Sequence, residues 1–323
     1  MSRYEFTPYP ASWYRLAHSD EIKKGQITSV GYLGREFLVY RDDAGSARVT
    51  DPFCPHLGAH LGVGGKIDAG RIVCPFHGWA FDGSGDCVDI PYCDKIPSRA
   101  KLSAFEVREA NGLIFVWWDP AGREPLFEIP ELRETGDGPW KRHTTLRWKF
   151  RSHIQEIIEN GVDFAHFNKL HQFLELPTGA EVATDGPRLH LGFDTKRRLL
   201  GMTAESHMTA DFWGMGFYNT PVQAGGIDID TYMTPTPVDD ETIEVCLDVM
   251  FRRSANPAKI LKNQLVHRVV TKGIKDEFER DIKVWEAKAY RTNPGLCRDD
   301  GPIMKVRNWC EQFYPEGALE SVS

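Results

Sequence analysis

NGVDFAHFNKLH, residues 160–171, is the stretch around which this chain is organised. It places two imidazoles, His166 and His171, beside one carboxylate, Asp163. Iron that is held by two histidines and a distant carboxylate keeps coordination positions open, and oxygen chemistry needs such positions. The spacing therefore predicts a metal site in this stretch, with everything else in the chain serving that site.

The segment before this stretch, FRSHIQEIIEN at residues 150–160, has helical character. Ile154, Ile157 and Ile158 mark an apolar face. The polar side chains between them are expected to face outward, and they are Gln155, Glu156 and Glu159.

Asp163 and His166 are three residues apart and share a face if the helix persists. His171 lies five residues beyond His166, and that offset misses the helical face. We therefore expect the helix to loosen or end between the two histidines.

Length and charge restrict the class of protein. The 323 residues exceed one typical domain, so two domains are expected. The net charge of −7 argues against nucleic-acid or anionic-membrane partners, which select a basic face. The N-terminus lacks the apolar core of a signal peptide, and the densest apolar run, residues 113–118, is too short to span a bilayer. We therefore expect a cytoplasmic protein whose seven cysteines are reduced. Cys87 and Cys93 are expected to be reduced residues that pack in the interior.

Two loops, CPHLG at residues 54–58 and CPFHGW at 74–79, each combine one cysteine with one histidine. In a Rieske cluster two cysteines hold one iron and two histidines hold the other. A structural zinc site is the alternative, because two cysteines and two histidines also bind zinc. Zinc fingers, however, usually present a pair of cysteines and a pair of histidines, whereas each loop here mixes one of each. We interpret His60 as a loop residue and not as a ligand. The candidate cluster ligands are Cys54, His56, Cys74 and His77.

The rest of the chain suggests strands followed by one long helix. Short alternating groups over residues 27–49 predict a small antiparallel β-domain, and residues 120–138, with proline, glutamate and glycine, predict a linker. Residues 185–249 alternate polar and apolar side chains as an antiparallel sheet does. The large side chains of Trp213, Met215, Phe217 and Tyr218 are expected in its core, with a pocket wall as the alternative. Asn256-Pro257 predicts the start of a helix that runs to about Tyr290.

One apolar stripe on that helix carries a carboxylate. A buried carboxylate without a partner is costly, so Asp281 should have a cation, and a metal is the obvious one. A salt bridge to an arginine is the alternative, and Glu277 and Glu279 are the fallback ligands. The stripe consists of Ile274, Phe278, Asp281 and Trp285.

These motifs together resemble a known family. CPHLG and CPFHGW look like the binding loops of Rieske [2Fe–2S] domains, and the pattern from Asn160 through Asp163 and His166 to His171 resembles the catalytic domain of Rieske non-heme iron oxygenases. The C-terminal tail is similar to the steroid-acting branch, which includes the oxygenase component of 3-ketosteroid 9α-hydroxylase and the cholesterol 7-desaturases. The tail residues that carry the likeness are Asp281, Trp285, Arg307, Asn308, Trp309, Gln312, Phe313 and Tyr314.

The resemblance implies an α+β fold. Residues 1–125 would form an all-β Rieske [2Fe–2S] domain, and residues 126–323 a helix-grip catalytic domain with a curved antiparallel sheet flanked by helices. It also implies that His166, His171 and Asp281 bind Fe(II). Asp163, with Asn160 beside it in the motif, would link that iron to the Rieske histidines of a neighbouring subunit in a homotrimer.

The implied function is that of a terminal oxygenase, which hydroxylates a steroid-like or other small hydrophobic substrate with O2. Electrons would come from NAD(P)H through a separate flavin and iron–sulfur reductase, with or without a ferredoxin. A demethylase, a desaturase or an oxygenase of aromatic compounds remains open on the same machinery. A Rieske electron-transfer protein without catalysis is the alternative from another class.

Overall fold

The computed structural model describes residue 4 and residues 6–132, 140–199, 202–224, 227–252 and 256–315. The chain divides into two compact units. Residues 14–117 and 129–131 form the N-terminal unit, and residues 1–13, 118–128 and 132–323 form the C-terminal unit.

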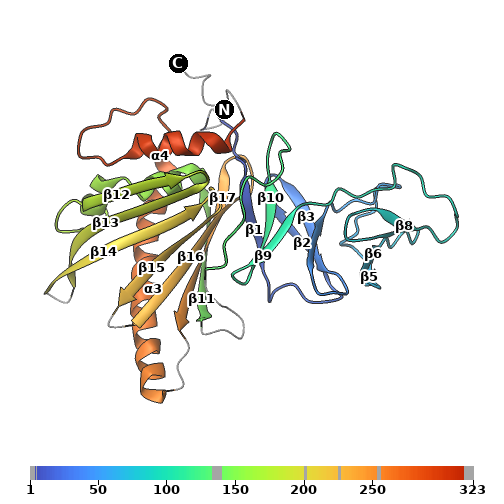
Figure 1. Cartoon of the computed structure of the whole chain (residues 1–323), viewed down its shortest axis with the longest axis horizontal. Helices are drawn as coiled ribbons and strands as arrows, with labels where there is room; N and C mark the ends of the chain where they lie inside the picture. Colours follow the sequence, from blue (N-terminus) through green and yellow to red (C-terminus); the bar gives the residue numbers. More distant parts are fainter. Residues whose placement is uncertain are drawn as a thin grey trace. The chain divides into compact units, whose positions relative to one another are not determined.

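The N-terminal unit is built from short antiparallel strands, as the sequence predicts (Figure 1). One sheet has the order β1-β10-β9 and a second has the order β2-β3-β4. Strand β1, every residue of which is buried, was not predicted. The bounds are β1 Ser12–His18, β2 Ile27–Tyr32, β3 Arg35–Arg41, β4 Ala47–Thr50, β9 Val107–Ala110 and β10 Leu113–Trp118.

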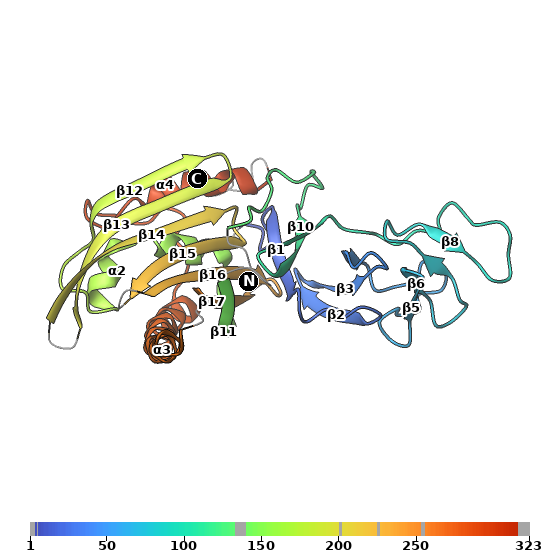
Figure 2. The ribbon, with the colours of Figure 1, turned by 60° about the horizontal axis from the view of Figure 1, so that its bottom comes forward.

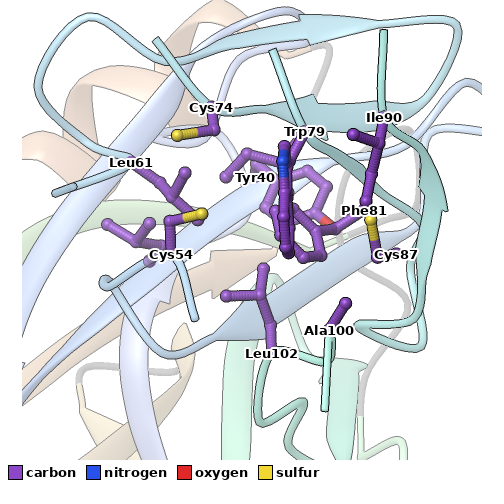
Figure 3. Close-up of a cluster of buried hydrophobic side chains, with 12 residues drawn as sticks. Tyr40, Cys54, Leu61, Cys74, Trp79, Phe81, Cys87, Ile90, Ala100 and Leu102 are labelled. Carbon is purple, nitrogen blue, oxygen red and sulfur yellow. The ribbon is translucent and has the colours of Figure 1, made fainter. Parts of the chain in front are cut away.

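A third sheet, with the order β5-β6-β7-β8, holds the cysteine and histidine loops. The loop at residues 74–79 connects β6 to β7, and a hairpin turn that contains Gly83 and Gly85 connects β7 to β8. Figure 3 shows the buried cluster beneath these loops, with Cys54 and Cys74 at one end beside Leu61 and with Cys87 at the other. The bounds are β5 Lys66–Asp68, β6 Arg71–Val73, β7 Ala80–Phe81 and β8 Cys87–Asp89.

The C-terminal unit contains the predicted antiparallel sheet, which has seven strands in the order β11-β17-β16-β15-β14-β13-β12. Figure 2 shows how strongly these strands twist. Met215, in the turn before β15, and Phe217, which begins that strand, are fully buried, as expected for core residues. The bounds are β11 Trp140–Arg151, β12 Thr178–Asp185, β13 Arg188–Leu199, β14 Met202–Trp213, β15 Phe217–Ala224, β16 Ile227–Pro237 and β17 Thr242–Arg252.

Helix α3, Pro257–Ala287, crosses the β11, β17 and β16 side of this sheet (Figures 1 and 2). Its Val270 and Ile274 pack against a buried cluster that includes Leu247 and Val249 of β17. The helix begins where the Asn-Pro signal predicts and ends three residues before the predicted Tyr290. The other helices are α1 Ile154–Asn160, α2 Phe164–Lys169 and α4 Ile303–Cys310, followed by the short 3₁₀ helix η1 Glu311–Phe313.

The predicted linker and the predicted role of the cysteines can be compared with the structure. Residues 120–132 of the predicted linker contain no helix or strand, and its residues 133–138 lie outside the described part. All seven cysteines are free, but Cys93 is exposed, so its predicted packing role is wrong. Within the described segments, no helix has the length and apolar character that crossing a bilayer requires.

Candidate metal centres

The stretch at residues 160–171 folds as two short helices rather than one. Helix α1 ends at Asn160, and Asp163 is the N-cap residue of α2, although its side chain makes no capping hydrogen bond. The helical face that Asp163 and His166 were expected to share is therefore interrupted. Helix α2 ends at Lys169, which confirms the break expected between His166 and His171.

The orientation of the His166 ring is fixed by the main chain. Its Nδ1 donates a hydrogen bond to the carbonyl oxygen of Asp163. The Nε2 atom consequently carries the lone pair, and it lies 4.0 Å from Oδ1 of Asp281 and 3.2 Å from Nδ2 of Asn160. Burial lowers the pKa of His166, opposed by the Asp163 carbonyl and the Asp281 charge, and so favours the neutral ring that binds metals.

Asp281 and His171 complete a cluster with His166. One ligand atom from each of the three residues lies within 4.8 Å of the others. Oδ1 of Asp281 is buried and has no hydrogen-bond partner, although Nε2 of His171 is only 3.1 Å away. That approach lacks hydrogen-bond geometry, and the buried Nδ1 of His171 has no partner either, so the carboxylate oxygen and the imidazole face each other without a hydrogen bond. A metal cation satisfies both, and the three residues fit iron by number and type of ligand.

The structure supports neither the salt bridge between Asp281 and an arginine nor the two fallback ligands. Its nearest charged partners are the two histidines rather than an arginine. Glu277 pairs with Arg197 at 3.5 Å, and Glu279 lies 3.7 Å from Lys275. Neither fallback carboxylate belongs to the cluster.

Aromatic side chains form an apolar wall beside the cluster. The ring of Phe167 lies 4.2 Å from that of His166 and 6.0 Å from that of His171. On β15, burial and then the charge of Asp281 raise the pKa of Tyr218, so its hydroxyl stays neutral near the carboxylate. Nothing in the sequence pattern separates this tyrosine from the core residues around it. The wall consists of Phe164, Phe167, Phe173 and Phe193, with Met208 packed against them.

The cysteine and histidine loops share one backbone geometry. The N–H of each cysteine donates to the carbonyl five residues later, at 2.9 Å for Cys54 and 2.8 Å for Cys74. Each cysteine carbonyl accepts from the glycine four residues later, Gly58 or Gly78, at 3.0 and 3.1 Å. Both glycines have positive φ, +75° and +76°, a conformation that glycine adopts without steric cost.

The four candidate ligands of these loops face one another. The rings of His56 and His77 are 4.7 Å apart, and His56 stacks on Trp79 at 4.5 Å. The buried Nδ1 of His56 has no partner, as expected of an atom that binds a metal. Burial raises the pKa of the Cys54 thiol to about 11, and the adjacent Cys74 also raises it.

The spread of these ligand atoms bears on the zinc alternative. A single zinc ion at ~2.0–2.3 Å from each ligand atom requires all four to lie close together. No three of the four, all of which are described residues, gather within 4.8 Å. That spread suits a two-iron cluster better than one ion. The Nε2 atom of His60, by contrast, lies 3.0 Å from Oε1 of Glu36, so this histidine pairs with a carboxylate outside the two loops.

The outward face predicted for α1 is wrong, because its three polar residues are all buried. Glu159 pairs with Arg307, and Glu156 with Lys288. Gln155 accepts a hydrogen bond from the Tyr314 hydroxyl at 2.7 Å. The C-terminal segment thus supplies the partners of α1, and its cationic and hydroxyl side chains were the signal that sequence reasoning missed.

Comparison with known proteins agrees with this geometry. Residues 12–100 match the Rieske [2Fe-2S] domain, and residues 116–314 match the 3-Ketosteroid 9alpha-hydroxylase C-terminal domain. This chain belongs to the Rieske oxygenase family of the 3-ketosteroid 9α-hydroxylase type. It is the terminal oxygenase of a Rieske system rather than an electron carrier, and its cofactors are a Rieske cluster, mononuclear iron and O2.

Relatives share most of the length of this oxygenase. A cholesterol 7-desaturase of Hemicentrotus pulcherrimus is 33% identical, over 96% of this chain and 71% of its own. A probable 3-ketosteroid-9-alpha-monooxygenase oxygenase component of Rhodococcus rhodochrous is 30% identical, over 95% and 80%. Among solved structures, NdmA of Pseudomonas putida CBB5 with caffeine has a TM-score of 0.71 at 20% identity, over 93% and 89%, and supports the fold.

Proposed function

We propose that this oxygenase oxidises a C–H bond of a steroid-like substrate at iron held by His166, His171 and Asp281. The observation that carries the ligand assignment is the convergence of Asp281 Oδ1 and His171 Nε2, which lie 3.1 Å apart and buried without a hydrogen bond between them. The bound iron would supply oxygen activation at its open coordination positions. In this proposal residues 1–125 form the electron-accepting domain and residues 126–323 the catalytic domain.

The chain's own residues would prepare the site for this chemistry. The Asp163 carbonyl holds the tautomer of His166, so that Nε2 is available as a ligand. The buried aromatic rings around Phe167 exclude water and offer an apolar surface to the substrate. The cluster ligands in this proposal are Cys54, His56, Cys74 and His77.

The substrate class is supported by the wall and by the relatives. Proteins named as acting on cholesterol and on 3-ketosteroids are 30–33% identical to this chain, and an apolar polycyclic compound suits the phenylalanine surface. The test is product analysis with a panel of 3-ketosteroids and sterols, and with small aromatic compounds for comparison, using a surrogate NAD(P)H-dependent reductase. Oxidised steroid products support the proposal, and conversion of aromatic compounds alone would overturn it.

The relatives' names also favour a second outcome on the same scaffold. Several are named desaturases rather than monooxygenases. Mass analysis of the same products separates the two reactions, because hydroxylation adds one oxygen atom and desaturation removes two hydrogen atoms.

A homotrimer, in which the cluster of one chain serves the iron of its neighbour through the Asp163 side chain, completes the proposal. Large apolar side chains are exposed in and near the cluster loops, where a docking partner would cover them. A separate reductase delivers the electrons, and the free cysteines accord with the cytoplasmic location that we propose. The exposed apolar residues include Phe53, Leu57, Val63, Phe76 and Tyr92.

Hybrid assemblies test this arrangement. One chain carries Cys54→Ser and lacks the cluster, and the other carries Asp281→Ala and lacks the iron. Each variant alone should be inactive. If electrons cross between subunits, trimers assembled from a mixture regain part of the activity, because some neighbours then pair a cluster with an iron. Hybrids that stay inactive despite verified co-assembly would exclude transfer between chains.

A further inference from the structure

A cavity of about 200 Å³ lies between α1 and the chain that follows α3. At ~30 Å³ for each water molecule, it has room for about six. Its wall is mixed, and within it carboxylates from α1 face cations from the C-terminal segment. The residues that matter here are Glu156, Glu159, Asn160, Asp163, Lys288 and Arg307.

Glu156 is the unusual member of this wall. Its side chain is fully buried, whereas that of Lys288, which contacts one of its carboxylate oxygens, is 39% exposed. The other oxygen, Oε1, has no hydrogen-bond partner. A buried, unpaired carboxylate oxygen is costly unless water or a proton satisfies it. The cavity that Glu156 lines is where such water would lie.

Asn160 separates this cavity from the metal cluster. It lines the cavity, and its amide Nδ2 lies 3.2 Å from Nε2 of His166. Water in the cavity is therefore one side chain away from the candidate iron position. Asp163 lines the same cavity.

We propose that Glu156 holds a proton at the inner end of a hydrated route, and that this route supplies protons to the oxygen site past Asn160. The inference rests on the proposed function. Oxidation of a C–H bond with O2 takes up two electrons and two protons for each O2, whether the product is an alcohol or an alkene. The reductase supplies the electrons, and solvent water supplies the protons through the Glu156 carboxyl, which gives up one proton and then takes another from the cavity.

The charges around Glu156 are consistent with this role. Burial raises its pKa, and the Glu159 charge raises it further, whereas Lys288 and Arg307 lower it; the net direction is upward. Its carboxyl therefore keeps a proton at a higher pH than an ordinary glutamate does. The groups facing it are Glu159 and Asp163 from the α1–α2 region, Lys288, Tyr290 and Arg291 from the segment after α3, and Arg307 from α4.

The first test needs neither iron nor substrate. Infrared difference spectra of the iron-free protein should show the carbonyl stretch of a protonated carboxylic acid, lost in Glu156→Gln, with a midpoint above the ordinary glutamate range. Lys288→Gln should move that midpoint to still higher pH, because it removes a cation that favours the ionised form. Absence of the band in the parent protein overturns the proposal. This result stands apart from the steroid assignment, which can fail without affecting it.

The second test separates a proton route from a simple ion pair. Glu156→Gln should slow product formation by about tenfold or more and raise the solvent deuterium isotope effect, because proton delivery becomes limiting. If Glu156 only neutralises Lys288, the double variant Glu156→Gln/Lys288→Gln removes both charges and should recover. We expect it to remain slow, with full iron and cluster content. Recovery of the rate, or an unchanged isotope effect in Glu156→Gln, overturns the proposal.

Discussion

Arg307 of α4 forms a bidentate ion pair with Glu159 of α1, with Nε 3.0 Å from Oε1 and Nη2 2.8 Å from Oε2. Both side chains are largely buried. The guanidinium also donates to the carbonyl oxygen of Arg291 at 2.7 Å and lies 4.5 Å over the ring of Tyr290. Glu159 directly precedes Asn160, so this pair anchors the end of α1 from which the metal stretch begins.

Removing the cation from this pair should destabilise the oxygenase strongly. Arg307→Met leaves the buried Glu159 carboxylate without its cation, although Gln155 still donates to it at 2.8 Å, and loss of a buried ion-pair partner costs about 3–5 kcal/mol. Arg307→Lys keeps the charge but loses the two-pronged geometry, so it should cost less. Denaturant unfolding of the two variants beside the parent measures the difference. Equal stability of Arg307→Met and the parent would contradict the anchoring role.

Asp163→Ala should abolish turnover while both metal sites stay loaded. The substitution keeps the main-chain carbonyl that orients His166, and it removes a side chain that makes no capping hydrogen bond to α2. The proposed iron ligands should therefore be unaffected, and only the proposed electron relay would be lost. Iron content, the visible cluster spectrum and product formation are measured on the same sample. Near-normal turnover would remove Asp163 from the electron path.

Asp281→Ala should release the mononuclear iron and leave the Rieske cluster intact. The lost carboxylate is one of the three proposed ligands, and the residues of the cluster loops are unchanged. Iron analysis should fall from about three to about two atoms per chain, while the visible cluster spectrum persists. Glu277→Ala serves as the matched control from the same helix, because that carboxylate pairs with Arg197. Iron that stays at about three in Asp281→Ala would mean that another residue is the third ligand.

The sequence predicted the histidine and cysteine pairs because metal chemistry restricts their spacing over a few residues. Asp281 was predictable for another reason, since a carboxylate on an apolar stripe needs a cation. The structure brings His166, His171 and Asp281 together, across more than a hundred residues of chain.

The burial of Glu156 and Glu159 could not be predicted from their own segment. Their partners, Lys288 and Arg307, lie more than 130 residues later in the chain. A local helical pattern counts a charged side chain as solvent-facing, and only tertiary contacts can reverse that assignment. Tyr218 has the same difficulty, because its nearness to Asp281 depends on how β15 and α3 pack.

The paired glycines of the cluster loops offer a matched comparison. At Gly58 a Cβ atom would meet nothing within 4 Å, whereas at Gly78 it would lie 2.9 Å from Cγ of Pro91. Alanine at either site should cost about 1–2 kcal/mol of folding stability, because its Cβ atom disfavours the positive φ. Gly78→Ala adds a steric clash, so it should lose more cluster and unfold at a lower temperature than Gly58→Ala. Visible absorbance per chain and thermal melts measure both effects; the opposite order would show that Pro91 yields easily.

His153 should make the oxygenase sensitive to acid. It is the N-cap of α1, where Nδ1 accepts from the Gln155 N–H at 3.1 Å and Nε2 donates to the Thr7 carbonyl at 3.1 Å. Burial lowers its pKa from 6.5 to about 4, so the folded protein holds the neutral ring while the unfolded chain takes up a proton.

The contribution of His153 to the free energy of unfolding is fully present above pH ~6.5 and is lost as the pH falls towards about 4. The loss amounts to about 3 kcal/mol. Urea unfolding of the parent across this range should show the loss. His153→Asn keeps a capping side chain that does not titrate, so its stability should vary less with pH. Carboxylates that titrate in the same window are common to both proteins and cancel in the difference. Parallel curves for the two would mean that the His153 ring is already protonated in the folded state or reaches water.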